Sequence, residues 1–419
     1  MKPTVTEIGN SIRYDWEDIH VAMRASRVRE HSDGRVTAEL RTTTSAPGYS
    51  PHLDQRSVNL LTSKVSFARE LSLVFEADWS TMLEQVKVYT LEWIRRGEPV
   101  CELWGDGESE PPTYLIDPLV VEGYPNVFFG DPGSFKSGLA IVLATTLTLP
   151  WSDNPLLWQE PRESTKCLYL DWETDRKTVN WTLARMNRGH GLPSFALHYR
   201  RCFAPLYSDI EAISELADSC EAKVIIIDSL GMASGSDDLN SSATATNFYR
   251  GLRQLNRTSI ILAHNAKDRE RKERSIYGNQ YFTAQARNIW EVRSVQETGA
   301  DSMDVGLFHR KAPPFAKFSH PMGMLVEFQN NSITVKEQEP KTVAEFVAQM
   351  SLKQQIKELL TREGAMAMKE IQNSLGGNSE SVRVSVQGMK KAGLIVKIGN
   401  DKFGMATQES VRERYGNGQ

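Results

Sequence analysis

The sequence predicts an α/β core that lies between a small α+β segment and a C-terminal segment of compact helices with a hairpin. Three observations predict this architecture. Strand-like and helix-like patterns alternate over 116–338, which is typical of parallel strands joined by helical crossovers. The run 224–227 is apolar throughout, as expected for a strand covered on both faces. From residue 351 the pattern changes to short helices followed by two short strands.

Length and composition set broad limits. A chain of 419 residues is too long for one ordinary core, and two or three domains are expected. The net charge is −4, so a nucleic-acid surface must be local rather than a property of the whole chain. The four cysteines form no CxxC pair, which favours reduced thiols over a zinc site or a disulfide framework. No signal-peptide or membrane-spanning pattern is present, so a cytoplasmic protein without membrane contact is expected.

The chain divides into five predicted segments. Residues 1–115 form an α+β accessory domain, with a strand at 36–41, helices over 60–75 and 79–95, and a linker at 105–112. Residues 116–338 form the core, with strands at 126–129, 166–171, 223–228, 259–264, 288–295 and 303–309. Short runs at 315–320, 324–328 and 332–336 predict an antiparallel β-extension. A linker (339–350), a small domain (351–405) and a tail (406–419) follow.

A glycine-rich loop follows the first core strand and precedes a helix-forming run. Glycines let backbone N–H groups turn toward phosphate oxygens, and the new helix points its positive end at the same anion. Lys136 is expected to reach the β- and γ-phosphates of ATP, and Ser137 to supply a hydroxyl to Mg²⁺. The nucleotide-binding residues predicted here are Gly130, Asp131, Pro132, Gly133, Ser134, Phe135, Lys136, Ser137 and Gly138. Phe135 stands where the usual pattern has glycine, which bears on the rate of turnover more than on binding.

Polar residues end the later core strands. Asp228 closes a buried strand and is expected to hold Mg²⁺ together with Ser137. Ser229 follows it, so a base must come from elsewhere. Glu173, after the strand at 166–171, is the predicted base that deprotonates the attacking water, and Asp171 competes with it. His264, at the end of a third strand, is the predicted sensor of the γ-phosphate. Each also has a structural interpretation, namely a carboxylate stabilised near a helix N-terminus for Glu173 and an ordinary strand-end residue for Asp228 and His264.

These motifs resemble the RecA-like ATPases, above all the RepA-type hexameric helicases and their phage and plasmid AAA-domain relatives. The resemblance covers about 120–336 and includes the loop, 169–173, 225–229, 262–267, 276–279, 286–287 and 308–311. It supports Glu173 as the base and His264 as the sensor. It also implies oligomeric rings, possibly hexamers, with the nucleotide between subunits. Arg310 or Lys311 is then a candidate finger that acts in trans, although either can instead cap a strand or pair with an acid.

Two regions are candidates for DNA contact. The first is a loop after the sensor strand, which resembles the loops that line the channel of RecA-like rings and is expected to meet single strands. Its basic residues are Lys267, Arg269, Arg271, Lys272 and Arg274. Tyr277, Tyr281 and Phe282 nearby suit either base stacking or core packing.

The second region is 351–405, which resembles a winged helix-turn-helix. Its third helix, at 380–391, carries Arg383 and Lys390 on the predicted recognition face for duplex DNA. Many winged helices serve protein contacts instead.

The leading functional prediction is a MgATP-dependent ATPase that acts on DNA, of the replicative-helicase or recombination type, possibly with replication proteins as partners. The alternatives are a nucleotide-gated DNA-binding regulator, which Phe135 favours, and an adaptor that loads another helicase.

Overall fold

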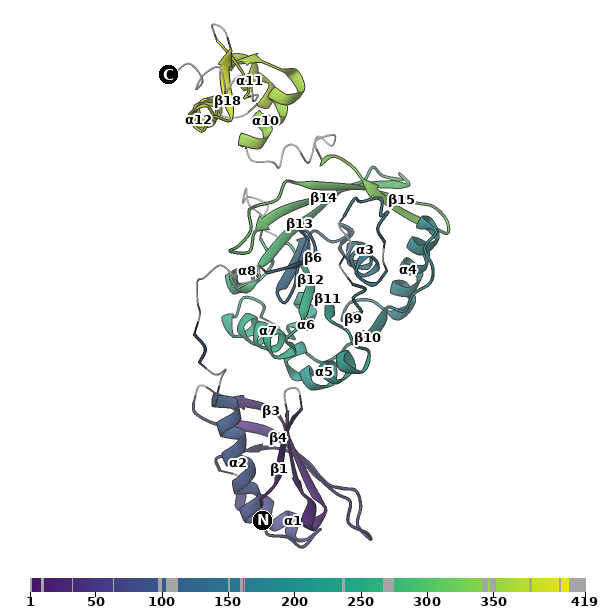
Figure 1. The fold of residues 1–419 in the computed structure, drawn as a ribbon, viewed down its shortest axis with the longest axis vertical. Helices are drawn as coiled ribbons and strands as arrows, with labels where there is room; N and C mark the ends of the chain where they lie inside the picture. Colours follow the sequence, from purple (N-terminus) through teal and green to yellow (C-terminus); the bar gives the residue numbers. More distant parts are fainter. Residues whose placement is uncertain are drawn as a thin grey trace.

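The computed structural model describes residues 2–8, 11–31, 33–62, 64–96, 100–102, 112–149, 151–158, 161, 163–235, 238–266, 275–340, 346, 352–376, 379–398 and 401–406. The basic loop at 267–274 lies outside them, as do most of both predicted linkers and of the tail. Three bodies follow one another along the chain (Figure 1). Within the described parts, no helix combines the length and the hydrophobicity needed to cross a lipid bilayer.

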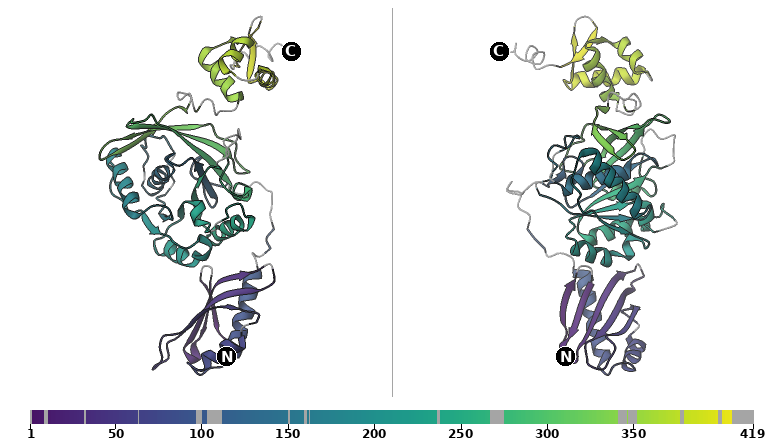
Figure 2. Two further views of the ribbon diagram at one scale, coloured as in Figure 1. Left: turned by 180° about the vertical axis from the view of Figure 1, so that it is seen from behind. Right: turned by 90° about the vertical axis from the view of Figure 1, so that its right-hand side faces the viewer.

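The first body is an antiparallel sheet with two helices on one face (Figure 2). Alternation in the strands sends one set of side chains toward the helices, where Trp16, Met23 and Trp79 are buried. Asp78 caps the second helix by accepting a hydrogen bond from Thr81 N at 3.1 Å. The elements are β1 (Thr4–Ile8), β2 (Ser11–Trp16), β3 (Val21–Glu30), β4 (Val36–Thr44), β5 (His52–Asn59), α1 (Lys64–Ser72) and α2 (Trp79–Arg96).

The central body is built on a nine-stranded mixed sheet, in the order β10-β9-β11-β12-β8-β13-β14-β15-β16. The first six strands of that order run parallel and the last three are antiparallel. The strands are β8 (Pro125–Gly130), β9 (Cys167–Asp171), β10 (His198–Arg201), β11 (Val224–Asp228), β12 (Thr258–His264), β13 (Asn288–Val295), β14 (Ser302–Lys311), β15 (Met322–Phe328) and β16 (Ile333–Glu337). A short hairpin, β6 (Tyr114–Ile116) with β7 (Val120–Val121), precedes them.

Helices cover both faces of the parallel strands (Figure 1). The apolar run of β11 alternates between two cores, because Val224 and Ile226 belong to one cluster and Ile225 and Ile227 to the other. Asp175 caps α4 by accepting from Lys177 N and Thr178 N, and Gly191 ends that helix with φ 62°. The helices are α3 (Lys136–Thr148), α4 (Arg176–His190), α5 (Ile210–Ser219), α6 (Leu230–Ala233), α7 (Ser242–Leu255) and α8 (Gln280–Gln285).

In the central body, one predicted strand is absent and one strand of the nine-stranded sheet was not predicted. The run 315–320 contains no strand, and its Ser319 N donates instead to the His309 ring at 3.0 Å. A strand at His198–Arg201 was missed because an edge strand of polar residues has no apolar alternation. The first lies in the connection between β14 and β15 and the second is an edge strand, and burial constrains the sequence least in such places.

The last described body holds α10 (Leu352–Glu363), α11 (Met368–Leu375) and α12 (Ser379–Lys391). A three-stranded sheet, β17 (Met366–Ala367), β19 (Lys402–Met405) and β18 (Ile395–Ile398), accompanies them. Ile356, Val386 and Phe403 meet in one apolar cluster. Val384, on the outer side of α12, is 61% exposed. This arrangement is compatible with a winged helix, which remains a prediction.

The buried His309 gives the central body a pH dependence. Its ring stacks on Trp290 with 4.3 Å between centroids, Nε2 donates to Asn288 Oδ1 at 2.9 Å, and Nδ1 accepts from Ser319 N. Burial lowers the pKa of His309 to about 4. The stability that the neutral ring contributes is therefore complete above the unfolded pKa of about 6.5, and is lost as the pH falls from there through the folded value.

Urea unfolding at pH 7.5 and 5.5 measures this effect. We expect the wild-type protein to lose on the order of 1 kcal/mol more over this interval than His309→Gln. The variant is destabilised at both values of pH but lacks the titrating ring. Equal losses in the two proteins would mean that His309 does not titrate with folding.

Candidate nucleotide-binding site

A tight loop joins β8 to α3 at the carboxyl edge of the parallel strands. Gly130 ends β8, and a Cβ there would collide with the Val292 carbonyl oxygen. Gly133 turns the loop with φ 78°. The first turn of α3 leaves backbone N–H groups without helical partners, and these groups carry the positive end of the helix. The loop is thus shaped to receive an anion.

Lys136 lies inside this loop. Its Nζ donates to the carbonyl oxygens of Gly130 at 3.1 Å and Asp131 at 2.7 Å, and the residue is 8% exposed. Burial lowers the pKa of Lys136, while the negative charges of Glu173, Asp228 and Asp131 oppose that shift. An ammonium group therefore sits inside the loop, where phosphate oxygens would replace these carbonyl oxygens as its partners.

The structure explains how phenylalanine replaces the usual glycine. Phe135 has φ 70°, the left-handed conformation that glycine adopts readily and that costs other residues roughly 1–2 kcal/mol. Its ring lies directly against Gly138, where any side chain would overlap it, and its centroid is 6.4 Å from that of Phe328. Gly138 thus makes room for Phe135, and ring packing offsets the backbone strain.

This pairing predicts a compensating pair of substitutions. Gly138→Ala is expected to displace the Phe135 ring, distort the loop and weaken ATP binding about tenfold or more. Phe135→Gly removes the ring, so Gly138→Ala in that background should bind ATP nearly as well as Phe135→Gly alone. Calorimetric titration of the four proteins with ATP gives the coupling. Equal effects of Gly138→Ala in both backgrounds would show that the ring contact is irrelevant.

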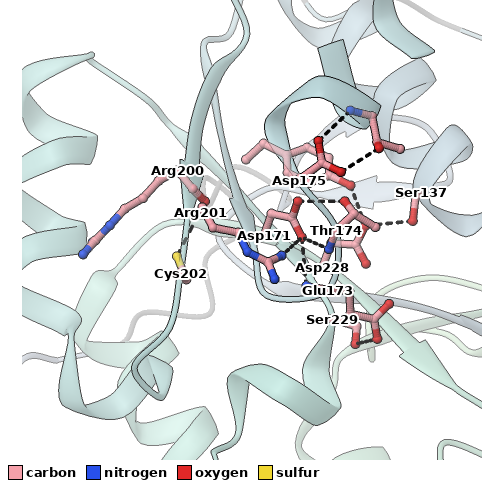
Figure 3. A network of polar contacts seen from close by, with 12 residues as sticks. Ser137, Asp171, Glu173, Thr174, Asp175, Arg200, Arg201, Cys202, Asp228 and Ser229 are labelled. Atoms are coloured by element: carbon pink, nitrogen blue, oxygen red, sulfur yellow. Dashed lines mark hydrogen bonds and ion pairs between the residues drawn. The ribbon is translucent and has the colours of Figure 1, made fainter. Parts of the chain in front are cut away.

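Ser137 and Asp228 come together from different elements. Ser137 Oγ donates to Asp228 Oδ2 at 2.7 Å, and Tyr169 OH donates to the same oxygen at 2.6 Å (Figure 3 shows Ser137 beside Asp228). Burial raises the pKa of Asp228, and these two hydrogen bonds oppose the rise. A hydroxyl and a carboxylate beside a phosphate-shaped loop are oxygen ligands of the kind that Mg²⁺ prefers, so these residues fit that ion.

Glu173 lies next to this pair, in the loop after β9. Its Oε1 accepts from Ser229 Oγ at 2.5 Å and from His264 Nε2 at 3.0 Å. The hydrogen bond from His264 is the main cause that lowers the pKa of Glu173. Its other oxygen, Oε2, makes no hydrogen bond within the described residues, and the side chain is 31% exposed. Glu173 is therefore an ionised carboxylate with one oxygen free to accept a proton.

Asp171, the competing base, is fully buried and already occupied. Its two oxygens accept from five donors, which are Glu173 N, Thr174 N, Thr174 Oγ1, Tyr199 OH and Arg201 Nη1. Figure 3 shows it at the centre of a polar network. Asp171 organises the loop that carries Glu173 and has no oxygen to offer a water molecule.

The strand register brings these residues to one edge of the sheet. Asp171 lies opposite Asp228 on the neighbouring strand, and His264 lies opposite Gly130. The ammonium group and the acids therefore share an edge, as the sequence predicts. Sequence reasoning missed two supporting contacts, namely those of the Tyr169 and Ser229 hydroxyls. It also missed Asn265, whose Nδ2 donates to Asp131 Oδ1 at 3.0 Å. Each of these residues adjoins or belongs to a predicted motif, but no pattern marks its partner.

The two candidate fingers are engaged within their own chain. Arg310 Nη2 lies 2.6 Å from Oε2 of the buried Glu291. Lys311 Nζ donates to the carbonyl oxygens of Thr283 and Ala284. Lys311 lies opposite Ile289, whose partner on β8 is Val127, so it is remote from the loop end of that strand. For Arg310 the structure thus shows the acid pairing that was one alternative to a finger, whereas Lys311 caps the C-terminal turn of α8 rather than a strand.

The candidate DNA-contact residues differ in whether the structure describes them and in how exposed they are. The basic loop with Lys267, Arg269, Arg271, Lys272 and Arg274 lies outside the described residues. Beside it, Tyr277 and Tyr281 are 42% and 46% exposed, whereas Phe282 is buried against Phe248 and cannot stack on a base. Arg383 on α12 is exposed and Lys390 is half-buried.

Comparison with known proteins agrees with this geometry. Residues 96–270 match a protein-family model described as an AAA domain. No curated protein matches the chain. The matched segment contains the phosphate loop, both acidic strand ends and His264. Together, the match and the shared sheet edge support an AAA-type P-loop ATPase as the central domain of this chain.

Proposed function

We propose that the chain hydrolyses MgATP and uses the energy to act on DNA as a member of an oligomeric ring. The observation that carries the proposal is the arrangement of Lys136, Asp228 and Glu173 around one loop. Lys136, which lies inside the loop, would bind the β- and γ-phosphates, and Ser137 and Asp228, which lie in contact, would hold Mg²⁺. Bound Mg²⁺ would neutralise charge that develops on the phosphates.

Glu173 acts as the base in this proposal. The free Oε2 takes the proton of the attacking water, and Ser229 and His264 hold Oε1 so that the free oxygen keeps its direction. His264 senses the γ-phosphate, because a phosphate that competes for its Nε2 changes the contact with Glu173. The finger from a neighbouring subunit is Arg310 or Lys311, released from its own partner on assembly.

DNA contact is assigned to two places. Tyr277 and Tyr281 flank the basic loop and are exposed enough to stack on unpaired bases. Arg383 and Lys390 on α12 contact duplex DNA through a winged-helix domain. A role in replication or recombination follows from this combination and from the resemblance to RepA-type helicases.

Phosphate release in the presence and absence of DNA, together with the native mass, tests the proposal. We expect turnover that rises several-fold with single-stranded DNA, and a mass that is a multiple of the 47.2 kDa chain. A monomer whose turnover ignores DNA would refute the proposal.

A second candidate function rests on Phe135, because its left-handed backbone conformation in the loop would slow ATP hydrolysis. In that case the protein is a nucleotide-gated DNA-binding regulator, which binds ATP and duplex DNA without turnover. An adaptor for a separate helicase would instead show unwinding only when that partner is added.

A further inference from the structure

The N-terminal sheet has an open face with an unusual row of charge. Helices α1 and α2 cover the other face (Figure 2). On the open face, Arg13 of β2 lies opposite Arg24 of β3, and Arg24 lies opposite Arg41 of β4. Like charges directly opposite one another on neighbouring strands destabilise a sheet. Three guanidinium groups in one ladder row therefore require either local counter-charges or an anionic partner.

Local counter-charges satisfy this row only in part. Arg13 pairs with Asp15 at 2.8 Å, and Arg24 Nη2 lies 2.7 Å from Glu215 Oε1 of the central body. The Arg13 pair is bidentate, because Nε and Nη2 both donate to the Asp15 carboxylate, and Arg24 Nε also donates to Ser11 Oγ at 2.8 Å, but both pairs are partly exposed to solvent, which screens them. Arg41 is exposed and has no hydrogen bond or ion pair among the described residues. Among the described residues, the row thus presents one guanidinium without a partner and two whose ion pairs lie open to solvent.

The surroundings of the row show which kind of partner it suits. Arg13 and Arg41 line a hollow of about 420 Å³ on this face, together with Thr43, His52 and the acids Asp15 and Glu17. On β2, β3 and β4 the residues of this face are small or polar, whereas the edge strand β1 adds Ile8, which lies opposite Ser11 and is 39% exposed. A protein partner usually needs an apolar centre, and an unpaired nucleic-acid strand usually needs aromatic platforms. Among the described residues this face has a single isoleucine at its edge and no aromatic ring at its centre, whereas arginines and hydroxyls suit a phosphate backbone.

We propose that the open face of the N-terminal sheet, with Arg13, Arg24 and Arg41 at its centre, binds the phosphate backbone of duplex DNA. This inference deepens the proposed action on DNA and adds a contact surface distinct from the nucleotide site and from α12. The row spans three strands at about 4.8 Å spacing, so its guanidinium groups can reach neighbouring phosphates of one backbone. Contact with phosphates alone makes this binding indifferent to sequence.

The salt dependence of DNA binding by the full-length protein tests the proposal. Fluorescence anisotropy with a labelled 30-base-pair duplex gives Kd between 50 and 200 mM salt. The test variant is Arg13→Gln with Arg41→Gln, because both side chains are exposed and neither belongs to the nucleotide site. The control is Arg35→Gln with Arg69→Gln, which removes the same charge from exposed positions in the β3–β4 connection and on α1.

The test variant is expected to weaken duplex binding about tenfold and to reduce the slope of log K against log salt by about 1.8, while the control stays close to wild type. Wild-type binding with no difference between the two variants would overturn this inference but leave the proposed function intact. No duplex or single-strand binding by the wild type would defeat the proposed function itself. A loss confined to single strands, or displacement of the duplex by an equal charge of polyglutamate, would also overturn the assignment to duplex DNA.

Discussion

Replacement of Lys136 with alanine is expected to abolish measurable ATP binding while the fold stays intact. The ammonium group lies within the loop, and its partners there are the carbonyl oxygens of Gly130 and Asp131 and the Ser134 hydroxyl. Charge-assisted hydrogen bonds to phosphate are among the strongest that a side chain makes. Loss of two such bonds in a buried site corresponds to about 3 kcal/mol or more, which is at least a hundredfold in Kd. Titration calorimetry with ATP measures this loss.

The control for this experiment is Lys166→Ala. Lys166 is an exposed lysine that pairs with Glu221 just before β9, at the opposite edge of the sheet, so its loss should leave ATP affinity unchanged. Circular dichroism and thermal unfolding verify that both variants fold. Normal ATP affinity in a folded Lys136→Ala protein would disprove the assignment of the loop.

The core of the sheet could be predicted because burial constrains sequence most strongly there. The strands β8, β9, β11, β12, β13 and β14 each agree with their predicted ranges to within one or two residues. In β11, for example, both faces are covered, so every position before Asp228 is apolar. The order of the strands in the sheet could not be predicted from the sequence. For example, β8 lies between β12 and β13, and that placement depends on tertiary packing.

The site residues could be predicted where they belong to a short, local sequence motif. The loop and the strand-end acids each follow an apolar run, and parallel strands bring such ends to one edge. Side-chain hydrogen bonds between different strands leave no pattern in the sequence. The Tyr169 hydroxyl reaches Asp228 over 59 residues of sequence, and Ser229 reaches Glu173 over 56. The arginine row in the N-terminal sheet depends on strand register in the same way, and only the paired structure reveals it.

Phe135 illustrates a departure that the structure resolves in physical terms. The sequence marks the residue as an exception to the usual loop. The structure shows the same left-handed backbone that glycine would adopt, with the ring packed on Gly138. The exception is therefore a matched pair of residues three positions apart rather than a broken loop.

Replacement of Glu173 with glutamine is expected to leave ATP binding intact and to stop turnover. An amide keeps the size of the side chain and an oxygen that accepts from Ser229, so the loop should keep its shape. The amide cannot take a proton from water, and loss of a positioned general base lowers kcat by roughly 10²–10⁴-fold. The pKa of Glu173 is held below its ordinary range, mainly by His264, so the wild-type group is ionised at neutral pH and can accept a proton.

Glu163→Gln, at an exposed carboxylate that pairs with Lys223, is the matched control. Single-turnover phosphate release separates chemistry from binding, and near-normal turnover in Glu173→Gln would move the role of base to another group. Asp171 would be a poor successor, because its five hydrogen bonds leave it no oxygen for water.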